Sequence, residues 1–205
     1  MLKRRFTLLA VGLALVALIG ATEAAGSSSS GQLPALVTSK LPWSANDGSS
    51  LKSRLKAIGL HALSREGVAV HIHQHLDIVI NGRVLRGLPP YIGIHIDQQH
   101  PNNSIITEIH THDQTGIIHV ESPTVRTFTL ADFFDVWGVR FSSRCLGGYC
   151  ASGNKKIYVW VNAKRVRTDP RKIVLKSHQE IVVTYGTLAS VPKPLPPTYP
   201  FPQGY

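Results

Sequence analysis

The alternation of apolar and polar side chains over residues 70–80 constrains the fold more than any other feature of the chain. The segment reads Val-His-Ile-His-Gln-His-Leu-Asp-Ile-Val-Ile. Successive side chains of a β-strand point to opposite faces, so a strand here carries aliphatic residues on one face and imidazoles on the other. The segment therefore predicts a strand whose apolar face packs on a core.

Two later segments, residues 105–112 and 117–121, show the same alternation. In both, isoleucine or valine occupies one face, and histidine or glutamate occupies the other. The polar positions are Glu108, His110, His112, His119 and Glu121. We expect all three segments to be strands that turn their histidines away from the core.

The sequence Asp113-Gln-Thr-Gly116 predicts a tight turn between these two segments. A loop of two or four residues would pair His110 with His119, with their Cβ atoms about 5 Å apart. A three-residue loop with a bulge would instead turn His119 to the opposite face. The register of this hairpin decides whether the imidazoles converge.

Imidazole is the commonest side-chain ligand for transition metals, and His-x-His on a strand aims two rings at one point. We therefore predict a three-histidine metal site at His110, His112 and His119. The first strand's His71, His73 and His75 either complete this site or form a second one. The acidic residues expected to orient the imidazoles or accept a proton are Asp77, Glu108, Asp113 and Glu121.

The ion expected at such a site is zinc or copper(II), because three histidines suit both. A blue-copper site is not expected, because it requires a free thiolate and both cysteines are expected to form a disulfide. Methionine-rich copper(I) handling is excluded, because Met1 is the only methionine. The two cysteines, Cys145 and Cys150, enclose two glycines and predict a local disulfide, with a redox-active or metal-binding pair as the alternative.

The chain begins with features of an export signal. Residues 3–5 are basic, residues 6–21 are apolar, and small residues follow up to residue 25. We expect residues 1–25 to be a cleaved signal peptide. The alternative is an uncleaved signal anchor that holds the protein at the outer face of the membrane. The protein is thus predicted to be periplasmic, extracellular or membrane-tethered.

Composition divides the rest of the chain into three parts. Residues 26–48, rich in Ser and Gly, predict a flexible linker; residues 49–188 predict one histidine-rich β domain; and residues 189–205 predict an extended, loose proline-rich tail. The formal net charge of +10 favours a solvated surface or contact with an anionic cell-envelope surface. We expect no nucleic-acid partner for an exported protein.

The fold predicted for residues 49–188 is mainly β, an antiparallel sheet or sandwich with one or two short helices. One helix is expected after Ser50, ending near Gly59, and another after the capping residue Thr129, ending at Gly138. Residues 78–83 match residues 159–164 at an offset of 81 and predict a duplicated β-hairpin unit. The second copy lacks the histidines, so the fold itself does not require them.

Taken together, the histidine motifs and the Phe-Phe-x-x-Trp-Gly motif of residues 133–138 resemble a family of exported bacterial histidine-rich β proteins to which no activity is assigned. The resemblance covers about residues 68–186 and implies only that these motifs belong together. The pairing of His-x-His with a histidine on the next antiparallel strand is similar to that of α-carbonic anhydrases, in this local geometry alone.

We expect this chain to sequester or deliver copper or zinc outside the cytoplasm. A zinc-dependent hydratase or hydrolase is the second hypothesis, because three histidines leave a coordination position for an acidified water. A cell-envelope interaction module with a basic surface is the third.

Overall fold

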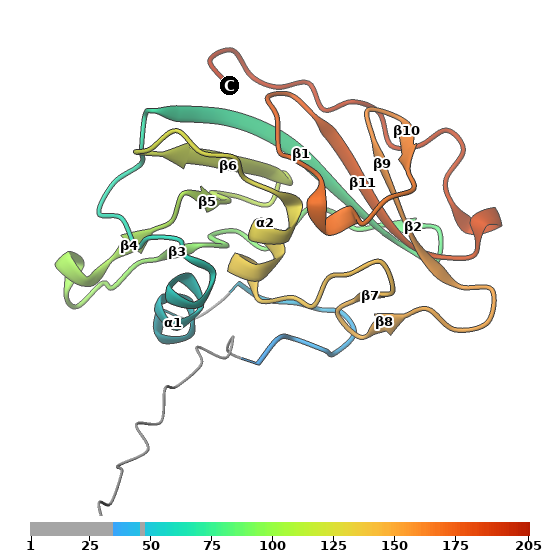
Figure 1. The fold of residues 1–205 in the computed structure, drawn as a ribbon, viewed down its shortest axis with the longest axis horizontal. Coiled ribbons are helices and arrows are strands. Elements are labelled where there is room, and N and C mark those ends of the chain that lie inside the picture. The colour runs from blue at the N-terminus through green and yellow to red at the C-terminus, as the bar shows by residue number, and fades with distance from the viewer. Residues whose placement is uncertain (1–34, 46–47) are drawn as a thin grey trace, which may run out of the picture. The chain divides into compact units, whose positions relative to one another are not determined.

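The computed structural model describes residues 35–45 and 48–205, which contain two α-helices, α1 (Gly48–Ile58) and α2 (Leu130–Trp137) (Figure 1). The strands are β1 (Val70–Ile80), β2 (Arg83–Val84), β3 (Ile94–His95), β4 (Ile105–Ile106), β5 (Ile109–His110), β6 (Ile117–Ser122), β7 (Cys145–Leu146), β8 (Tyr149–Cys150), β9 (Lys156–Val161), β10 (Lys164–Val166) and β11 (Glu180–Gly186). Short 3₁₀ turns lie at Pro101–Asn103, Pro170–Lys172 and Leu188–Ser190. The fold is mainly β, as predicted.

The predicted signal peptide and part of the predicted linker lie outside the described residues. Within the part that is described, no helix is both long enough and apolar enough to cross a bilayer.

One large sheet organises the molecule, with strands in the order β10-β9-β11-β1-β6-β5 and β2 paired beside β1. All of its pairs are antiparallel except β1 with β11, which run parallel. Two small two-stranded sheets, β3-β4 and β7-β8, lie outside it. Of the two predicted arrangements, the antiparallel sheet is therefore the closer one, with a single parallel pair at its centre.

Helix α2 packs on the apolar face of this sheet, and α1 packs against α2 and β3 (Figure 1). Leu76 and Ile78 of β1 and Ile118 of β6 join Leu51 of α1 and Phe133 of α2 in one hydrophobic core. The alternation in residues 70–80 thus places aliphatic side chains in the core and leaves the histidines on the opposite face, as predicted.

Helix α2 begins and ends where the sequence predicts. Thr129 and Asp132 form a capping box, and Gly138 adopts the left-handed conformation (φ 78°) that ends the helix. Helix α1 ends before Gly59 as expected, but it begins at Gly48, so Ser50 lies within the helix instead of capping it.

The two segments that match in sequence form equivalent hairpins. Asn81 and Gly82 link β1 to β2, and Asn162 and Ala163 link β9 to β10, all with positive φ values, as two-residue hairpin turns require. The predicted repeat is therefore a repeat of local structure.

The strand predicted over residues 105–112 divides into β4 and β5. Thr107 causes the break locally, because its hydroxyl bonds to both the carbonyl oxygen and the backbone N–H of Ile109. As a result, β4 pairs with β3, whereas β5 pairs with β6.

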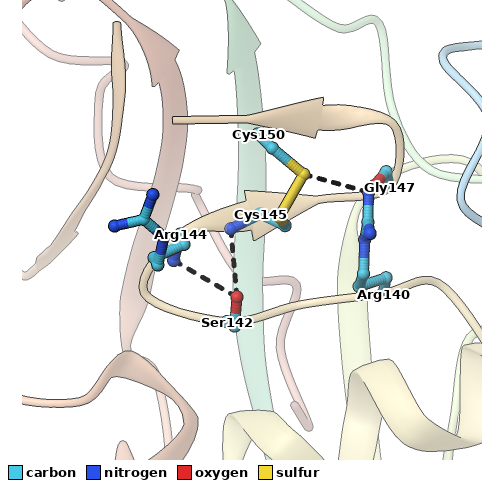
Figure 2. The surroundings of a disulfide bond; sticks show 6 residues. All are labelled: Arg140, Ser142, Arg144, Cys145, Gly147 and Cys150. Atoms are coloured by element: carbon cyan, nitrogen blue, oxygen red, sulfur yellow. Dashed lines mark hydrogen bonds between the residues drawn. A yellow bond between two sulfur atoms is a disulfide. The ribbon is translucent and has the colours of Figure 1, made fainter. Parts of the chain in front are cut away.

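Cys145 and Cys150 form the predicted disulfide, which closes the β7-β8 hairpin (Figure 2). The Arg140 guanidinium donates to the Gly147 carbonyl and to the Cys150 sulfur, and the Ser142 hydroxyl accepts from the Cys145 N–H. These contacts link the hairpin to the strand-like segment that precedes it.

Two terminal segments pack more than we predicted. Of the predicted flexible linker, residues 35–45 are described, and Trp43 is buried there against Trp137. The proline-rich tail, predicted to be loose, crosses the histidine side of the sheet, where Leu195 packs against a second hydrophobic cluster that contains Val79 and Trp160.

Candidate metal centre

Three neighbouring strands bring histidines into one row across the sheet. In the register of the structure, His110 of β5 faces His119 of β6, and His119 faces His73 of β1. This is the hairpin register that a two- or four-residue loop requires, so the predicted convergence of His110 with His119 occurs. His112 lies just beyond the end of β5.

The largest group of possible metal ligands among the described residues contains three histidines and one glutamate. His110, His112, His119 and Glu121 each offer one donor atom, and these four atoms lie within 4.8 Å of one another. The Nε2 atoms of His110 and His112 are 3.2 Å apart. Zinc–nitrogen bonds of about 2.0–2.1 Å in a tetrahedral site separate neighbouring ligand nitrogens by roughly 3.3 Å. The two imidazoles thus already lie at the spacing of ligands to one ion.

His110 is held as a neutral ring with a free nitrogen in the cluster. Its Nδ1 lies 2.8 Å from the Thr107 carbonyl oxygen, which can only accept, so Nδ1 carries the hydrogen. Burial lowers the pKa of His110 to about 3, although Glu121 and the Thr107 carbonyl favour the charged ring. The Nε2 lone pair is therefore available to a metal ion.

Glu121 lies at the centre of the histidines. Its Oε1 accepts from His119 Nδ1 at 3.0 Å, and its Oε2 lies 3.9 Å from His110 Nε2. Burial favours the neutral acid, but the hydrogen bond from His119 and the attraction of His110 prevail and lower the pKa of Glu121 to about 2. Oε2 is buried and finds no hydrogen-bond partner among the described residues. A buried carboxylate oxygen in this state is a strong acceptor for a cation.

His73 and His71 extend this arrangement along β1. Together with Glu121 they form a second group whose donor atoms lie within 4.8 Å of one another. Burial, followed by the neighbouring His119, lowers the pKa of His73 to about 4, so this ring is also neutral near pH 7. His71 is about half-exposed.

His75 has a different role from its neighbours. Its Nδ1 bonds to both oxygens of Glu180, at 2.9 and 3.1 Å, and its Nε2 lies 2.9 Å from the Thr115 carbonyl oxygen. Burial opposes the charge, but these acceptors raise the pKa of His75 overall. Both nitrogens are thus donors, and in this arrangement His75 forms a buried ion pair and has no lone pair for a metal.

The predicted acidic partners differ in where they lie. Asp77 lies 4.0 Å from His75, and burial is the main cause of its raised pKa. Asp113 accepts from Thr115 in the turn, and its carboxylate makes no hydrogen bond to the clustered imidazoles. Glu108 is buried and accepts from the backbone N–H and Nδ1 of His61, because the break at Thr107 separates it from the strand face.

Sequence reasoning did not anticipate the aromatic tail residues beside the histidines. Tyr199 stacks on His75 with ring centroids 4.5 Å apart, and its N–H donates to Glu180. Tyr205 lies 4.6 Å from His73 and 5.6 Å from His119, centroid to centroid. The tyrosines of the proline-rich tail could have predicted this contact, because large aromatic rings usually pack against other side chains.

The sequence analysis also missed Glu66 and Glu180. Glu66 lies 3.3 Å from His112 at the exposed edge of the cluster, and Glu180 forms the ion pair with His75. Both are distant in sequence from the histidines they contact. Neither carried a local signal.

Histidines without ligand spacing were expected on the surface. His61, His100 and His178 are exposed, and His95 is partly exposed. His178 nonetheless bonds to the Tyr205 carbonyl oxygen, and His61 to Glu108.

Comparison of the chain with protein-family models, with curated proteins and with solved structures gave no match.

Proposed function

We propose that this is an exported transition-metal-binding protein that holds one zinc or copper ion between His110, His112, His119 and Glu121. The observation that carries the proposal is the convergence of four donor atoms in a largely buried group. Three imidazoles and a carboxylate suit zinc and copper(II), and the chain offers no free thiolate to redirect the choice.

Sequestration or delivery is the role that a four-donor site supports best. Structural zinc sites are usually closed by four protein ligands, whereas catalytic sites keep one position for water. His112 is the most accessible of the four, with a side-chain exposure of 40%, so the ion would enter and leave past this residue. Cell-envelope anchoring and the export route remain expectations from the sequence.

The alternative role as a hydratase or hydrolase is favoured by one contact. The hydrogen bond between His119 Nδ1 and Glu121 resembles the carboxylate–histidine pairs that orient a zinc ligand from outside the coordination shell. If Glu121 acts in this way, the three histidines bind the ion and a water molecule occupies its fourth coordination position. The cobalt(II)-substituted protein separates the two roles. An added anion that displaces a bound water should change the visible spectrum, whereas an ion held by four protein ligands should show no such change at constant pH.

Metal content and affinity of the untagged full chain test the proposal. We expect a tightly held ion detectable by inductively coupled plasma mass spectrometry. His119→Ala should lower the affinity, measured by competition with a chromophoric chelator, by more than the roughly 10–100-fold cost of losing a residue outside the coordination shell.

His100→Ala is the matched control, because His100 is exposed and belongs to none of the groups of possible metal ligands among the described residues. His61 and His178 are poorer controls, since each bonds to another part of the fold. Failure to take up zinc or copper at micromolar concentrations would refute the proposal, as would an equal loss of affinity in His100→Ala.

A further inference from the structure

Glu121 lies between two groups of imidazoles. On one side, its Oε2 faces His110 at 3.9 Å; on the other, its Oε1 lies 3.4 Å from His73 Nε2 and 3.6 Å from His71 Nε2. A carboxylate can bind one cation through each oxygen. The arrangement around Glu121 is therefore that of a bridging ligand.

The strand register builds the second group without any contribution from loops. His71 faces Glu121 directly across the β1-β6 pair, and His73 faces His119. His71 and His73 are two residues apart on one strand and so share a face. The three donor atoms of His71, His73 and Glu121 lie within 4.8 Å of one another.

The distances within this group are longer than those of most hydrogen bonds. The distances of 3.4 and 3.6 Å from Glu121 Oε1 to the two imidazoles exceed the usual 2.7–3.2 Å of an N–H···O bond. They match the roughly 3.3–3.5 Å between two donors that each lie about 2.0–2.2 Å from a shared ion.

His73 is the buried member of this group. Its side chain is 4% exposed, and its Nδ1 finds no hydrogen-bond partner in the described part of the chain. Buried imidazole nitrogens are normally satisfied. Its other nitrogen, Nε2, faces Glu121, and the ring packs edge-on against His119 with the centroids 4.6 Å apart.

We propose that His71, His73 and Glu121 bind a second transition-metal ion, so that Glu121 bridges two ions on this face of the sheet. The inference rests on the proposed function, because Glu121 also belongs to the first site. The second site has only two histidines, and His71 is 49% exposed, so its remaining positions are filled by water. The second ion therefore binds more weakly and exchanges faster than the first.

Titration of the metal-free full chain with copper(II) tests this inference. We expect two equivalents to bind, the second more weakly. The electron paramagnetic resonance signal should grow with the first equivalent, and the second should broaden or diminish it, because two copper ions on one carboxylate couple magnetically.

Variants assign the second equivalent to its ligands. His71→Ala and His73→Ala should each reduce the stoichiometry to one and leave the first equivalent bound, since neither residue belongs to the first group of donors. Glu121→Gln should weaken both equivalents. His71→Ala keeps the test valid if the buried His73 variant fails to fold, and His100→Ala should retain both equivalents.

The outcomes separate this inference from the proposed function. One equivalent in the native chain, abolished by His119→Ala and unaffected by His71→Ala, would overturn the second site and leave the first intact. Two equivalents that both survive His71→Ala and His73→Ala would also overturn it. Binding of no copper or zinc at all would refute both proposals together.

Discussion

Histidines on one face of the sheet differ in protonation because each meets different partners. His73 and His110 are buried beside other imidazoles, and the pKa of each is lowered, to about 4 and about 3. His75, two residues from His73, lies between Glu180 and the Thr115 carbonyl, and its pKa is raised. The alternating pattern predicted the shared face correctly. It could not distinguish a neutral ligand from a charged ion-pair partner, because Glu180 lies 105 residues away in the sequence.

The His75–Glu180 pair predicts a pH dependence of stability for the metal-free protein. Because the folded-state pKa of His75 is raised above 6.5, its contribution is fully present below about pH 6.5 and is lost as the pH rises through the folded-state value. His75→Gln leaves Glu180 buried without its cation, so we expect a loss of about 3 kcal/mol or more below pH 6.5.

Urea unfolding with chelator present, at pH 6 and at pH 9, measures this effect. The difference between the native chain and His75→Gln should shrink at the higher pH. The same difference at both values would show that His75 is not charged in the folded protein.

At the scale of elements, the proline-rich tail of residues 189–205 lies against the histidines of the sheet. Tyr199 and Tyr205 lie on the rings of His75 and His73, and the Tyr205 carbonyl accepts from His178. The tail thus covers the imidazole face that the alternation leaves outside the core. Figure 1 shows this segment, in dark red, running along the sheet on the side away from the helices.

We expect this cover to slow metal exchange. Tyr199→Ala and Tyr205→Ala should speed transfer of bound metal to an external chelator by about two- to tenfold, because a ring–ring contact contributes about 0.5–1.5 kcal/mol. Stopped-flow absorbance with a chromophoric chelator measures the rate. Tyr91→Ala is the control, since Tyr91 is an exposed tyrosine outside the tail. Unchanged rates in both tail variants would show that the tail does not limit access.

The sequence predicted well those elements whose start, end or turn is specified by residues close together in the chain. The capping box at Thr129, the glycine at residue 138 and the hairpin turn at Asn81 all depend on residues within a few positions. The break between β4 and β5 was missed, although its cause, the Thr107 hydroxyl, is local. A threonine in an apolar run usually favours a strand, and only the competing bond to Ile109 reveals the break.

At the scale of the whole molecule, metal binding and folding are linked equilibria. The candidate ligands come from β1, β5, β6 and the turn after β5, so the site exists only when these strands are paired. An ion that binds the folded chain and not the unfolded one stabilises it by about 2.7 kcal/mol at a concentration 100 times its Kd.

We therefore expect zinc at this excess to raise the melting temperature by about 5–10 °C, given about 2–4 °C per kcal/mol for a chain of this size. Differential scanning fluorimetry with and without zinc measures the shift, which His119→Ala should abolish and His100→Ala should preserve. A shift of equal size in His119→Ala would place the stabilising ion elsewhere.

The sequence by itself predicted the mainly β fold, the face on which the histidines lie, a turn at residues 113–116 and the Cys145–Cys150 bond, but it left open the register that pairs His110 with His119. Each follows from a period of two or from residues close together in the chain. Only the tertiary structure placed Glu121 between two histidine groups, paired His75 with Glu180 and laid the tail over both. Those contacts join distant segments: β6 lies between β1 and β5, β11 lies beside β1, and the C-terminus packs over the histidines. Alternation along one strand carries no information about which strand lies beside it.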